Sequence, residues 1–557
     1  MVSERGVPDT ILRWRMRAAR ALRTLFFFLF ASVALHWGVA AAGALVDAAS
    51  DNDSALAIEL LSNGADVNEV SVDGTTALHW AAYHDDVELV RVLFEAGANA
   101  EVVNDYGSTP LAEAASTGNP AMMTLLIDAG AGVARANADG QTALMIVART
   151  NKLEAAELLI EAGADVNRAE TWRGQTPLMW AAAQSQPEMI RLLMEHGARS
   201  DVRSYVNDFR QVSGETRRMY RPTGGLTPLL FAAREGCAAC IEALIEGGAN
   251  ADFANPKNVT PLIMALDNAH MDAAKVLVEA GANVNKWDWW GRNPLWAAVD
   301  QNRVPAGGRA DRRTADDTLP IEVIELMLAN GANPNLQLKL SPPYRSIVDD
   351  RGCDSMLTTG MTPLLLAAKT FDVEAMQPLL AAGANFDLPN QSGVLPIAAA
   401  AGLGSSSCDP RGYGGGIPHY ETSDVQQASI ATLQALIDAG ADVNAQGPVV
   451  SSTGGGRFGG RSSGQTALHG AINWGWMEVI SFLVDQGARM DLRNSEGRTV
   501  YETAIGIGGG GRGRGASAVD EGAIATFLLE LCDAQADCDV EALAPPSNDL
   551  LGGRGPQ

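Results

Sequence analysis

The stretch DGTTALHWAAYHDDVELVRVLFEAGAN, residues 73–99, sets the pattern for most of the chain. Its features return at a fixed interval, because Thr76, Thr109 and Thr142 each lie 33 residues apart. Glycines equivalent to Gly97 recur with the same spacing. A period of about 20 to 50 residues is typical of stacked structural repeats. We therefore interpret the chain as one array of repeats and not as a series of separate globular domains.

Each repeat contains the signals for two helices and a connecting turn. A threonine precedes Pro110, Pro177 and Pro228, as expected where threonine caps a helix and proline takes its first position. Paired alanines such as Ala81 and Ala82 allow neighbouring helices to approach closely. A glycine then ends the second helix by adopting positive φ. The segment after it is expected to turn into a hairpin, called a finger below, that projects sideways.

The pattern DG-x-T-P/A-L-H-x-A-A, followed by an apolar helix and G-A-D/N-x-N, resembles the ankyrin repeat and returns about a dozen times. The resemblance covers about residues 43–532, and arrays exported by bacteria with a signal peptide and inserted loops look similar. It implies an all-α, right-handed solenoid of about 12 helix-turn-helix units with hairpin fingers. It also implies a non-catalytic scaffold that binds another protein through its fingers and concave face.

Residues 1–42 do not follow the repeat. Five arginines between positions 13 and 23 precede the apolar run Leu25–Ala34, and small residues follow at Ala40–Ala42. This order is typical of a secretory signal peptide. The alternative is an uncleaved anchor, because residues 25–42 reach the lower limit for a membrane span. Both interpretations predict export, to the bacterial periplasm or cell envelope, with attachment to the inner membrane if the segment is retained.

The repeat array is expected to occupy residues 43–540, followed by a disordered tail at 541–557. The 33-residue period is interrupted six times, which predicts insertions that alternate between fingers and interhelix turns. Loops of this size are commonly functional or disordered, and both alternatives stay open. The insertions are expected near residues 203–222, 302–318, 336–358, 403–424, 446–463 and 506–519.

Charge and motifs exclude several classes of function. The formal net charge of −25 disfavours nucleic acid as a partner. Membrane contact is expected only through the N-terminal segment, and the array is expected to be monomeric. We find no nucleophile elbow, phosphate-binding loop, metalloprotease motif or dinucleotide-binding fingerprint. No catalytic residue, metal ion or cofactor is therefore predicted, and His79 and His469 are expected to pair with the threonines of their own repeats.

The six cysteines suggest disulfides in an exported chain. Cys237 and Cys240 begin the second helix of a repeat, where we interpret Cys240 as a small core residue and not as part of a redox centre. The remaining four are disulfide candidates in two pairs, Cys353 with Cys408 and Cys532 with Cys538.

The positions that vary between ankyrin repeats predict the surface that binds a partner. They are the two residues before the finger glycine and the two after the paired alanines. Tryptophan, tyrosine and arginine dominate interface energetics, which favours the aromatic members of this set. The alternative is that neighbouring insertions cover the finger that holds Trp287. The predicted partner-binding residues are Tyr83, His84, Asp105, Tyr106, Trp172, Arg173, Trp289, Trp290, Asn473 and Trp474.

Two other functions remain open. An accessory enzyme or thiol-redox protein would build its site from the insertions, with Cys353, Cys408 and His419 near aspartates at positions 349, 350 and 354. A structural spacer tethered to the membrane would bind no partner at all.

Overall fold

The computed structural model describes residues 43–208, 222–302, 316–340, 359–404, 422–449, 464–505 and 521–534, together with 538–539 and 543. By its contacts the chain divides into two units. One comprises residues 1–143 and 161–164, and the other comprises 144–160 and 165–557. Each unit is described separately below.

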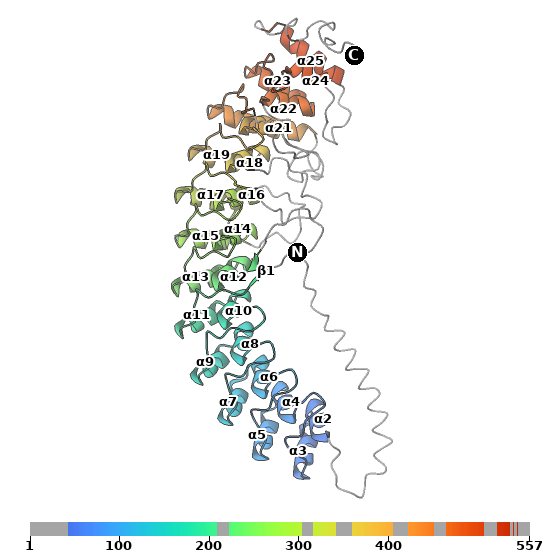
Figure 1. Ribbon diagram of the computed structural model, residues 1–557, viewed down its shortest axis with the longest axis vertical. Helices are drawn as coiled ribbons and strands as arrows, with labels where there is room; N and C mark the ends of the chain where they lie inside the picture. Colours follow the sequence, from blue (N-terminus) through green and yellow to red (C-terminus); the bar gives the residue numbers. More distant parts are fainter. Residues whose placement is uncertain are drawn as a thin grey trace, which may run out of the picture. The chain divides into compact units, whose positions relative to one another are not determined.

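Helices account for nearly all regular structure in the described residues, where 24 helices form twelve successive pairs (Figure 1). This confirms the predicted all-α array of about 12 helix-turn-helix units. The first unit holds α2 (Ala44–Ser50), α3 (Ser54–Ser62), α4 (Ala77–Tyr83), α5 (Val87–Glu95), α6 (Pro110–Thr117) and α7 (Pro120–Asp128).

The second unit continues the same helix-pair pattern from α8 onward. Its helices are α8 (Ala143–Thr150), α9 (Leu153–Glu161), α10 (Pro177–Ala183), α11 (Pro187–Glu195), α12 (Pro228–Glu235), α13 (Ala238–Glu246), α14 (Pro261–Asp267), α15 (Met271–Glu279), α16 (Pro294–Asn302), α17 (Pro320–Ala329), α18 (Pro363–Lys369), α19 (Val373–Ala381), α20 (Pro396–Ala400), α21 (Thr422–Asp438), α22 (Ala467–Trp474), α23 (Met477–Asp485), α24 (Val500–Ala504) and α25 (Glu521–Asp533).

Threonines begin most of the first helices, as the sequence predicts. Thr109 Oγ1 accepts a hydrogen bond from the backbone N–H of Ala112 at 3.2 Å, which satisfies a donor that the helix itself leaves unpaired. Where histidine stands three residues later, the cap takes another form. Thr76 Oγ1 lies 2.9 Å from Nδ1 of His79, and Thr466 and His469 make the same contact at 2.9 Å. The predicted pairing of both histidines is therefore confirmed.

Small and aliphatic residues make the core between successive pairs. In the second unit Leu178, Ala181 and Ala182 of α10 are fully buried, and α10 packs on both α11 and α12. The paired alanines carry only a methyl group, so neighbouring helices can approach closely at this position. Leu193 of α11 completes the contact from the second helix layer and is also fully buried.

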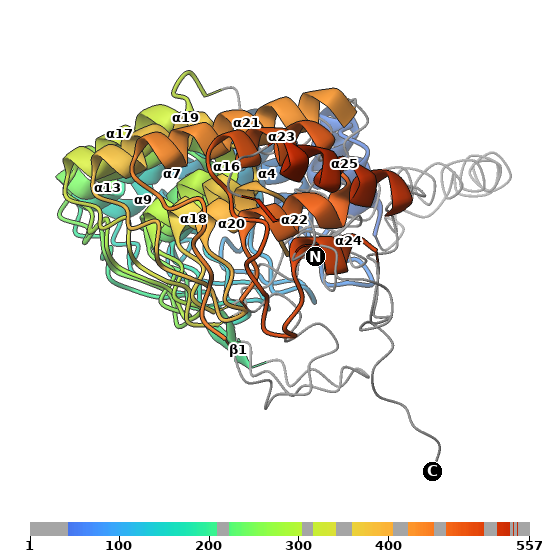
Figure 2. The ribbon, with the colours of Figure 1, turned by 90° about the horizontal axis from the view of Figure 1, so that it is seen from above.

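The loops that join the repeats of the second unit project together on one side of the helices (Figure 2). Asparagine side chains link one finger to the next. Asn167 Nδ2 donates to the carbonyl of Gly197 at 3.0 Å, while its Oδ1 accepts from the N–H of Arg199 at 2.8 Å. Asn285 repeats both contacts farther along the same unit. These bonds hold successive fingers in register.

The predicted insertion near 203–222 begins and ends as a short ribbon. Strands β1 (Val206–Asp208) and β2 (Pro222–Gly224) pair antiparallel, with Val206 opposite Gly224. Much of each predicted insertion lies outside the described residues, and so do Cys353, Cys408, His419 and the aspartates at 349, 350 and 354. The N-terminal segment 1–42 and nearly all of 541–557 also lie outside them, so the predictions for these segments stay predictions. Within the described part of the chain, none of the helices has the length and apolar character needed to cross a membrane.

Candidate functional site

Exposed aromatic side chains gather on successive fingers of the second unit. Trp172, Tyr205, Trp287 and Trp289 expose 68%, 51%, 45% and 66% of their surfaces. Isolated apolar residues on a surface are ordinary, but several large rings on neighbouring loops indicate an interaction surface. Together with the cations beside them we call this surface the finger strip. It comprises Trp172, Arg173, Tyr205, Lys257, Trp287, Trp289 and Lys339.

Cations lie against the aromatic rings of these fingers. The guanidinium carbon of Arg173 lies 4.2 Å from the ring centroid of Trp172, and Nζ of Lys339 lies 3.9 Å from that of Trp287. Such contacts are attractive because a cation faces the negative side of the ring, by about 0.5–1 kcal/mol at exposed sites. Both rings remain exposed to solvent beside their cations.

A buried carboxylate shapes the finger that carries Trp172 and Arg173. Glu170 exposes only 2% of its surface. Its two oxygens accept hydrogen bonds from the N–H groups of Trp172 at 2.6 Å, Arg173 at 2.8 Å and Gln175 at 2.9 Å. The turn is therefore closed from within, so its exposed side chains are presented by a fixed backbone.

The next finger packs directly on this one. The N–H of Tyr205 donates to the carbonyl of Arg173 at 2.6 Å. The Tyr205 ring lies so close to Gly174 that a Cβ there would come within 2.5 Å of it, and Gly174 also has a φ of +66°. A side chain at position 174 would therefore push the Tyr205 ring away from the finger strip.

The finger that carries Trp287 and Trp289 is built around a buried ion-pair network. Asp288 Oδ1 accepts from the N–H groups of Trp290 and Arg292, both at 2.9 Å, and its Oδ2 accepts from Nε of Arg292 at 2.7 Å. The guanidinium of Arg292 also donates twice to Asp267, at 2.8 and 2.9 Å. Burial disfavours the charged guanidinium, but the two carboxylates outweigh it and raise the pKa of Arg292. The arginine stays charged and fastens the finger to α14.

Backbone contacts continue from this finger to its neighbours on both sides. The N–H of Trp289 donates to the carbonyl of Lys257 at 2.9 Å, and Asn258 Nδ2 donates to the carbonyl of Trp287. The carbonyl of Trp290 accepts from the N–H of Lys339 at 2.9 Å. These bonds connect the fingers of Lys257, Trp287 and Lys339 within the second unit.

Trp290 differs from the expectation that it meets a partner, because it exposes only 6% of its surface. Adjacent residues in this turn point in opposite directions, so that Trp289 faces outward while Trp290 faces inward. Lys257 Nζ and the guanidinium of Arg292 lie 5.8 and 5.5 Å from the Trp290 ring. Trp290 therefore supports the finger from inside.

Two other predicted residues are held by contacts within the fold. Trp474 Nε1 donates to the carbonyl of Gly402 at 2.8 Å, and its ring stacks on Trp476 with centroids 5.8 Å apart. His84 Nε2 lies 3.1 Å from the carbonyl of Ser50. Both side chains are only partly exposed, and these contacts give them a structural role.

The remaining predicted residues are exposed and are not members of the finger strip as defined above. In the first unit Tyr83 and Tyr106 expose 50% and 67% of their surfaces, and Asp105 is exposed beside Tyr106. Asn473 is an exposed residue of α22. These residues stay predictions for contact with a partner.

The finger strip also contains residues that the sequence pattern did not single out, namely Tyr205, Lys257 and Lys339. Glu170 was missed as well, although a signal existed. Ser71, Asn104, Asn137 and Glu170 lie 33 residues apart, a regular run of polar residues just before each finger turn. Asn104 accepts hydrogen bonds from the N–H groups of Tyr106 and Ser108, so it closes its turn in the same way as Glu170 does.

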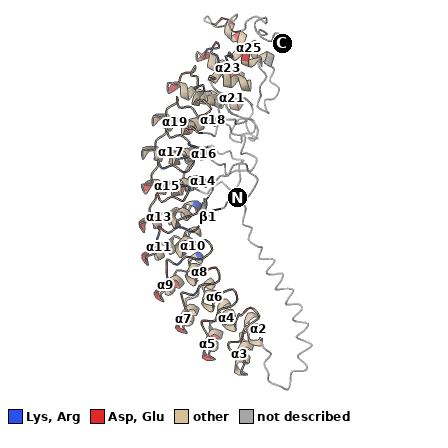
Figure 3. Ribbon diagram, in the orientation of Figure 1, with Lys and Arg blue, Asp and Glu red and all other residues tan. Residues whose placement is uncertain are grey.

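Charges of opposite sign lie in different places in the second unit (Figure 3). Acidic residues close the second helices, as Glu195, Glu246 and Glu279 do for α11, α13 and α15. Basic residues appear beside β1, and the finger strip contains Arg173, Lys257 and Lys339. The carboxylates of Glu170 and Asp288 are buried and hydrogen-bonded behind the finger surface.

The structure contains two disulfides among the described residues. Cys532 is joined to Cys538, as one of the predicted candidate pairs. Cys237 is joined to Cys240, a bond that the sequence interpretation of Cys240 as a core residue did not include. Cys240 is indeed fully buried, but it is also a disulfide partner. Within the described residues, no group of three or more histidine, cysteine, aspartate or glutamate side chains could hold a metal ion.

Comparison with known proteins agrees with the helix-pair architecture. A family model described as ankyrin repeats, in three copies, matches residues 45–137, 131–204, 213–288 and 229–307. A model of the single ankyrin repeat matches residues 463–495. Together the matches cover slightly more than half of the chain.

One similar solved structure is the crystal structure of the human ASB11 ankyrin repeat domain, at 23% sequence identity. The match covers 43% of this chain and 98% of that one, with a TM-score of 0.36. No curated protein matches the sequence.

Proposed function

The chain belongs to the ankyrin repeat family, and from that premise we propose that it is a non-catalytic scaffold that binds an acidic segment of a protein partner through the finger strip. Ankyrin repeats generally mediate protein–protein interaction. The chemistry of the partner and the location of the contact are the specific parts of the proposal.

The observation that carries the proposal is the set of exposed rings on fingers with fixed backbones. Trp172 and Trp289 expose about two thirds of their surfaces, while buried carboxylates close the turns behind them. Rigid aromatic anchors lose little conformational entropy on binding, and they supply large apolar contact areas. Solvation alone gives no reason to expose these rings together.

Charge supports an acidic partner. The finger strip presents Arg173, Lys257 and Lys339 in a chain whose formal net charge is −25. An acidic segment would be attracted to the strip and repelled by the acidic ends of the helices. This contrast favours one orientation of the partner and makes its association rate sensitive to salt.

The proposal places the scaffold outside the cytoplasm. Its support is the order of basic stretch, apolar run and small residues in positions 1–42. Protease protection in intact cells tests this part separately. Full-length protein that resists external protease after the outer envelope is permeabilised would contradict it.

The binding proposal is tested by crosslinking in the native cell. A photoreactive residue at position 289 should capture one acidic partner, whereas the same residue at Lys275, an exposed position on α15, should not. Affinity is then measured for that partner with a triple variant, Trp172→Ala, Trp287→Ala and Trp289→Ala. We expect its Kd to rise at least about 100-fold, because each anchor contributes more than about 1 kcal/mol.

Matched variants separate the strip from the rest of the surface. Lys257→Glu with Lys339→Glu should weaken binding about tenfold or more, while Lys275→Glu should leave it unchanged. Tyr106→Ala in the first unit should also have no effect. Equal losses with Lys275→Glu, or an unchanged Kd in the triple variant, would refute the proposal.

A further inference from the structure

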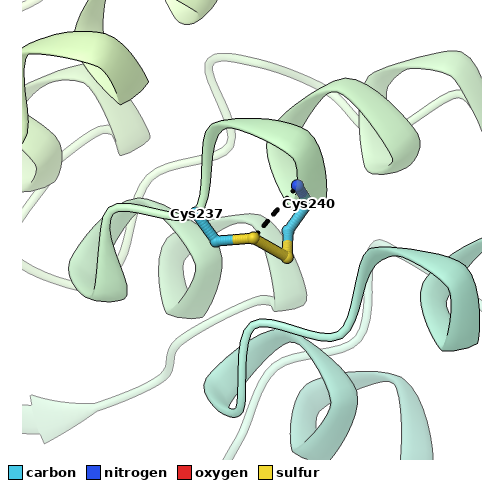
Figure 4. Close-up of a disulfide and its surroundings, with 2 residues drawn as sticks. All are labelled: Cys237 and Cys240. Carbon is cyan, nitrogen blue, oxygen red and sulfur yellow. Dashed lines mark hydrogen bonds between the residues drawn. A yellow bond between two sulfur atoms is a disulfide. The ribbon is translucent and has the colours of Figure 1, made fainter. Parts of the chain in front are cut away.

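Cys237 and Cys240 lie at the N-terminus of α13, joined by a disulfide (Figure 4). Cys237 is the residue that precedes the helix, and it is partly exposed. Cys240 is in the first turn and is fully buried. The two residues therefore differ in exposure, and Cys237 is the one on the solvent side.

Two other repeats have a carboxylate at the position of Cys237. In α5 and α19 the same position holds Asp86 and Asp372, whose carboxylates accept from the N–H groups of Leu89 and Ala375 at 2.9 and 3.1 Å. In α13 the acceptor is Sγ of Cys237, 3.2 Å from the N–H of Cys240. A thiolate at Cys237 would thus occupy a position where α5 and α19 hold a carboxylate.

The N-terminus of a helix stabilises negative charge through its unpaired N–H groups and its dipole. A cysteine in this position forms a thiolate more readily than a free cysteine, and the thiolate is the reactive form. The nine-residue helix α13 presents its first turn to Cys237 in this way.

The disulfide is not needed to hold α13 in place. It encloses only two residues, and a bond that closes so short a loop removes little entropy from the unfolded chain. Ile241 and Leu244 of the same helix are fully buried and anchor it to the stack. Equivalent helices such as α5 and α19 pack without any disulfide, so α13 can keep its position when the bond is reduced.

We propose that Cys237 and Cys240 form a redox-active pair that exchanges two electrons with thiols and disulfides of other molecules, and that Cys237 is the sulfur that reacts. This activity is independent of the proposed binding function. In reduction, a thiolate of the donor attacks Sγ of Cys237, a mixed disulfide forms, and Cys240 leaves as a thiolate.

A second thiol of the donor then attacks the mixed disulfide, which releases Cys237 and leaves the donor oxidised to a disulfide. The two cysteine thiolates released by reduction then take up protons from solvent, to an extent set by the pH of the solution. In the reverse direction the Cys237 thiolate attacks a disulfide, and Cys240 resolves the mixed disulfide. The co-reactant is a pair of thiols, from either a small molecule or a protein.

The test incubates the full chain in glutathione buffers of increasing reduced fraction, then alkylates and maps each cysteine by mass spectrometry. We expect the Cys237–Cys240 pair to pass from oxidised to reduced within the range that glutathione buffers cover, while α13 keeps its hydrogen-exchange protection. The Cys532–Cys538 pair is an internal reference in the same digest. A parallel series with a dithiol peptide shows whether a protein-like donor reacts faster than glutathione.

Two variants identify the reacting sulfur. Cys240→Ser should accumulate a mixed disulfide with glutathione at Cys237, at least about tenfold faster than Cys237→Ser does at Cys240, because Cys240 is buried and Cys237 is partly exposed. A pair that stays oxidised through the whole glutathione series overturns the proposal. Loss of α13 protection on reduction also overturns it, because the bond would then be structural.

Discussion

The ammonium group of Lys339 lies 3.9 Å from the ring centroid of Trp287, and this contact joins two successive fingers of the second unit. The backbone N–H of Lys339 also donates to the carbonyl of Trp290 at 2.9 Å. Lys339 therefore contacts both the exposed Trp287 ring and the backbone of the buried Trp290 in the same finger. A residue of the finger strip thus also helps to hold two neighbouring fingers together.

The coupling between Lys339 and Trp287 can be measured by a double-mutant cycle. Lys339→Met and Trp287→Leu should each lower the free energy of unfolding, with a coupling energy of about 0.5–1 kcal/mol from the lost cation–ring attraction. Urea unfolding followed by circular dichroism gives the four values. The same cycle with Lys275 in place of Lys339 should give no coupling, and equal coupling in both cycles would contradict the interpretation.

Replacing Glu170 should loosen the finger of Trp172. In Glu170→Gln an amide N–H group takes the place of an oxygen that accepts from backbone N–H groups, so buried donors lose their acceptor. We expect the free energy of unfolding to fall by about 1–3 kcal/mol. Glu157→Gln, at an exposed position of α9, is the control and should change stability by less than about 0.5 kcal/mol. Hydrogen exchange at Trp172 and Arg173 should rise only in the first variant.

Arg292→Met should lower the free energy of unfolding more than Glu170→Gln does, because it leaves two buried carboxylates without their counterion. Breaking a buried ion pair by removing one partner typically costs about 3–5 kcal/mol. The exposed pair Arg199 and Asp201 supplies the control, since solvent screens this pair and Arg199→Met should lower the free energy of unfolding far less than Arg292→Met does. Chemical unfolding followed by tryptophan fluorescence reports both effects, as Trp290 lies beside Arg292. If the two variants lowered the free energy of unfolding by similar amounts, the buried network around Arg292 would not stabilise the fold more than an exposed ion pair does.

Stability should fall as the pH falls from about 6.5 to about 4, partly through His469. Burial lowers the pKa of His469 to about 4, although the carbonyl of Arg498 opposes this. In the unfolded chain a histidine titrates near its ordinary pKa of about 6.5. Between these values the unfolded state binds more protons, so the free energy of unfolding decreases with falling pH, by up to about 3 kcal/mol.

The contribution of His469 can be isolated by comparing variants across this pH range. His469→Gln should be less stable at neutral pH but should lose less stability on acidification than the unmodified chain. His196→Gln, at an exposed position, should keep the full pH dependence. NMR titration of the imidazole checks the pKa directly, and a value near 6.5 in the folded chain would refute the assignment.

Much of the fold was predictable because its signals are local and periodic. The side chain of Thr109 caps a helix by accepting a hydrogen bond from a backbone N–H only three residues away, and Pro110 suits the first helical position whatever lies around it. Gly97 adopts a φ of +90° at the end of α5, as a C-cap requires. Such features depend on nearby residues, so the sequence of each repeat is enough to predict its two helices and its turn.

The candidate site was predictable only in part. The sequence identified Trp172 and Trp289 as finger residues, and both are exposed. It could not distinguish Trp289 from Trp290, because the direction of each side chain depends on the hydrogen bonds of Asp288 and Arg292 inside the turn. Lys339 was missed because its contact with Trp287 crosses from one repeat to the next.

The sequence by itself determined the repeat, the helix pairs and the positions of the fingers, since these follow from short-range capping and a 33-residue apolar period. Only the tertiary structure decided which finger residues face outward, which carboxylates are buried behind them, and that Cys237 is bonded to Cys240. Burial and side-chain pairing depend on which residues of neighbouring repeats come into contact. The period of the sequence predicts that the repeats stack, but it does not predict which side chains meet.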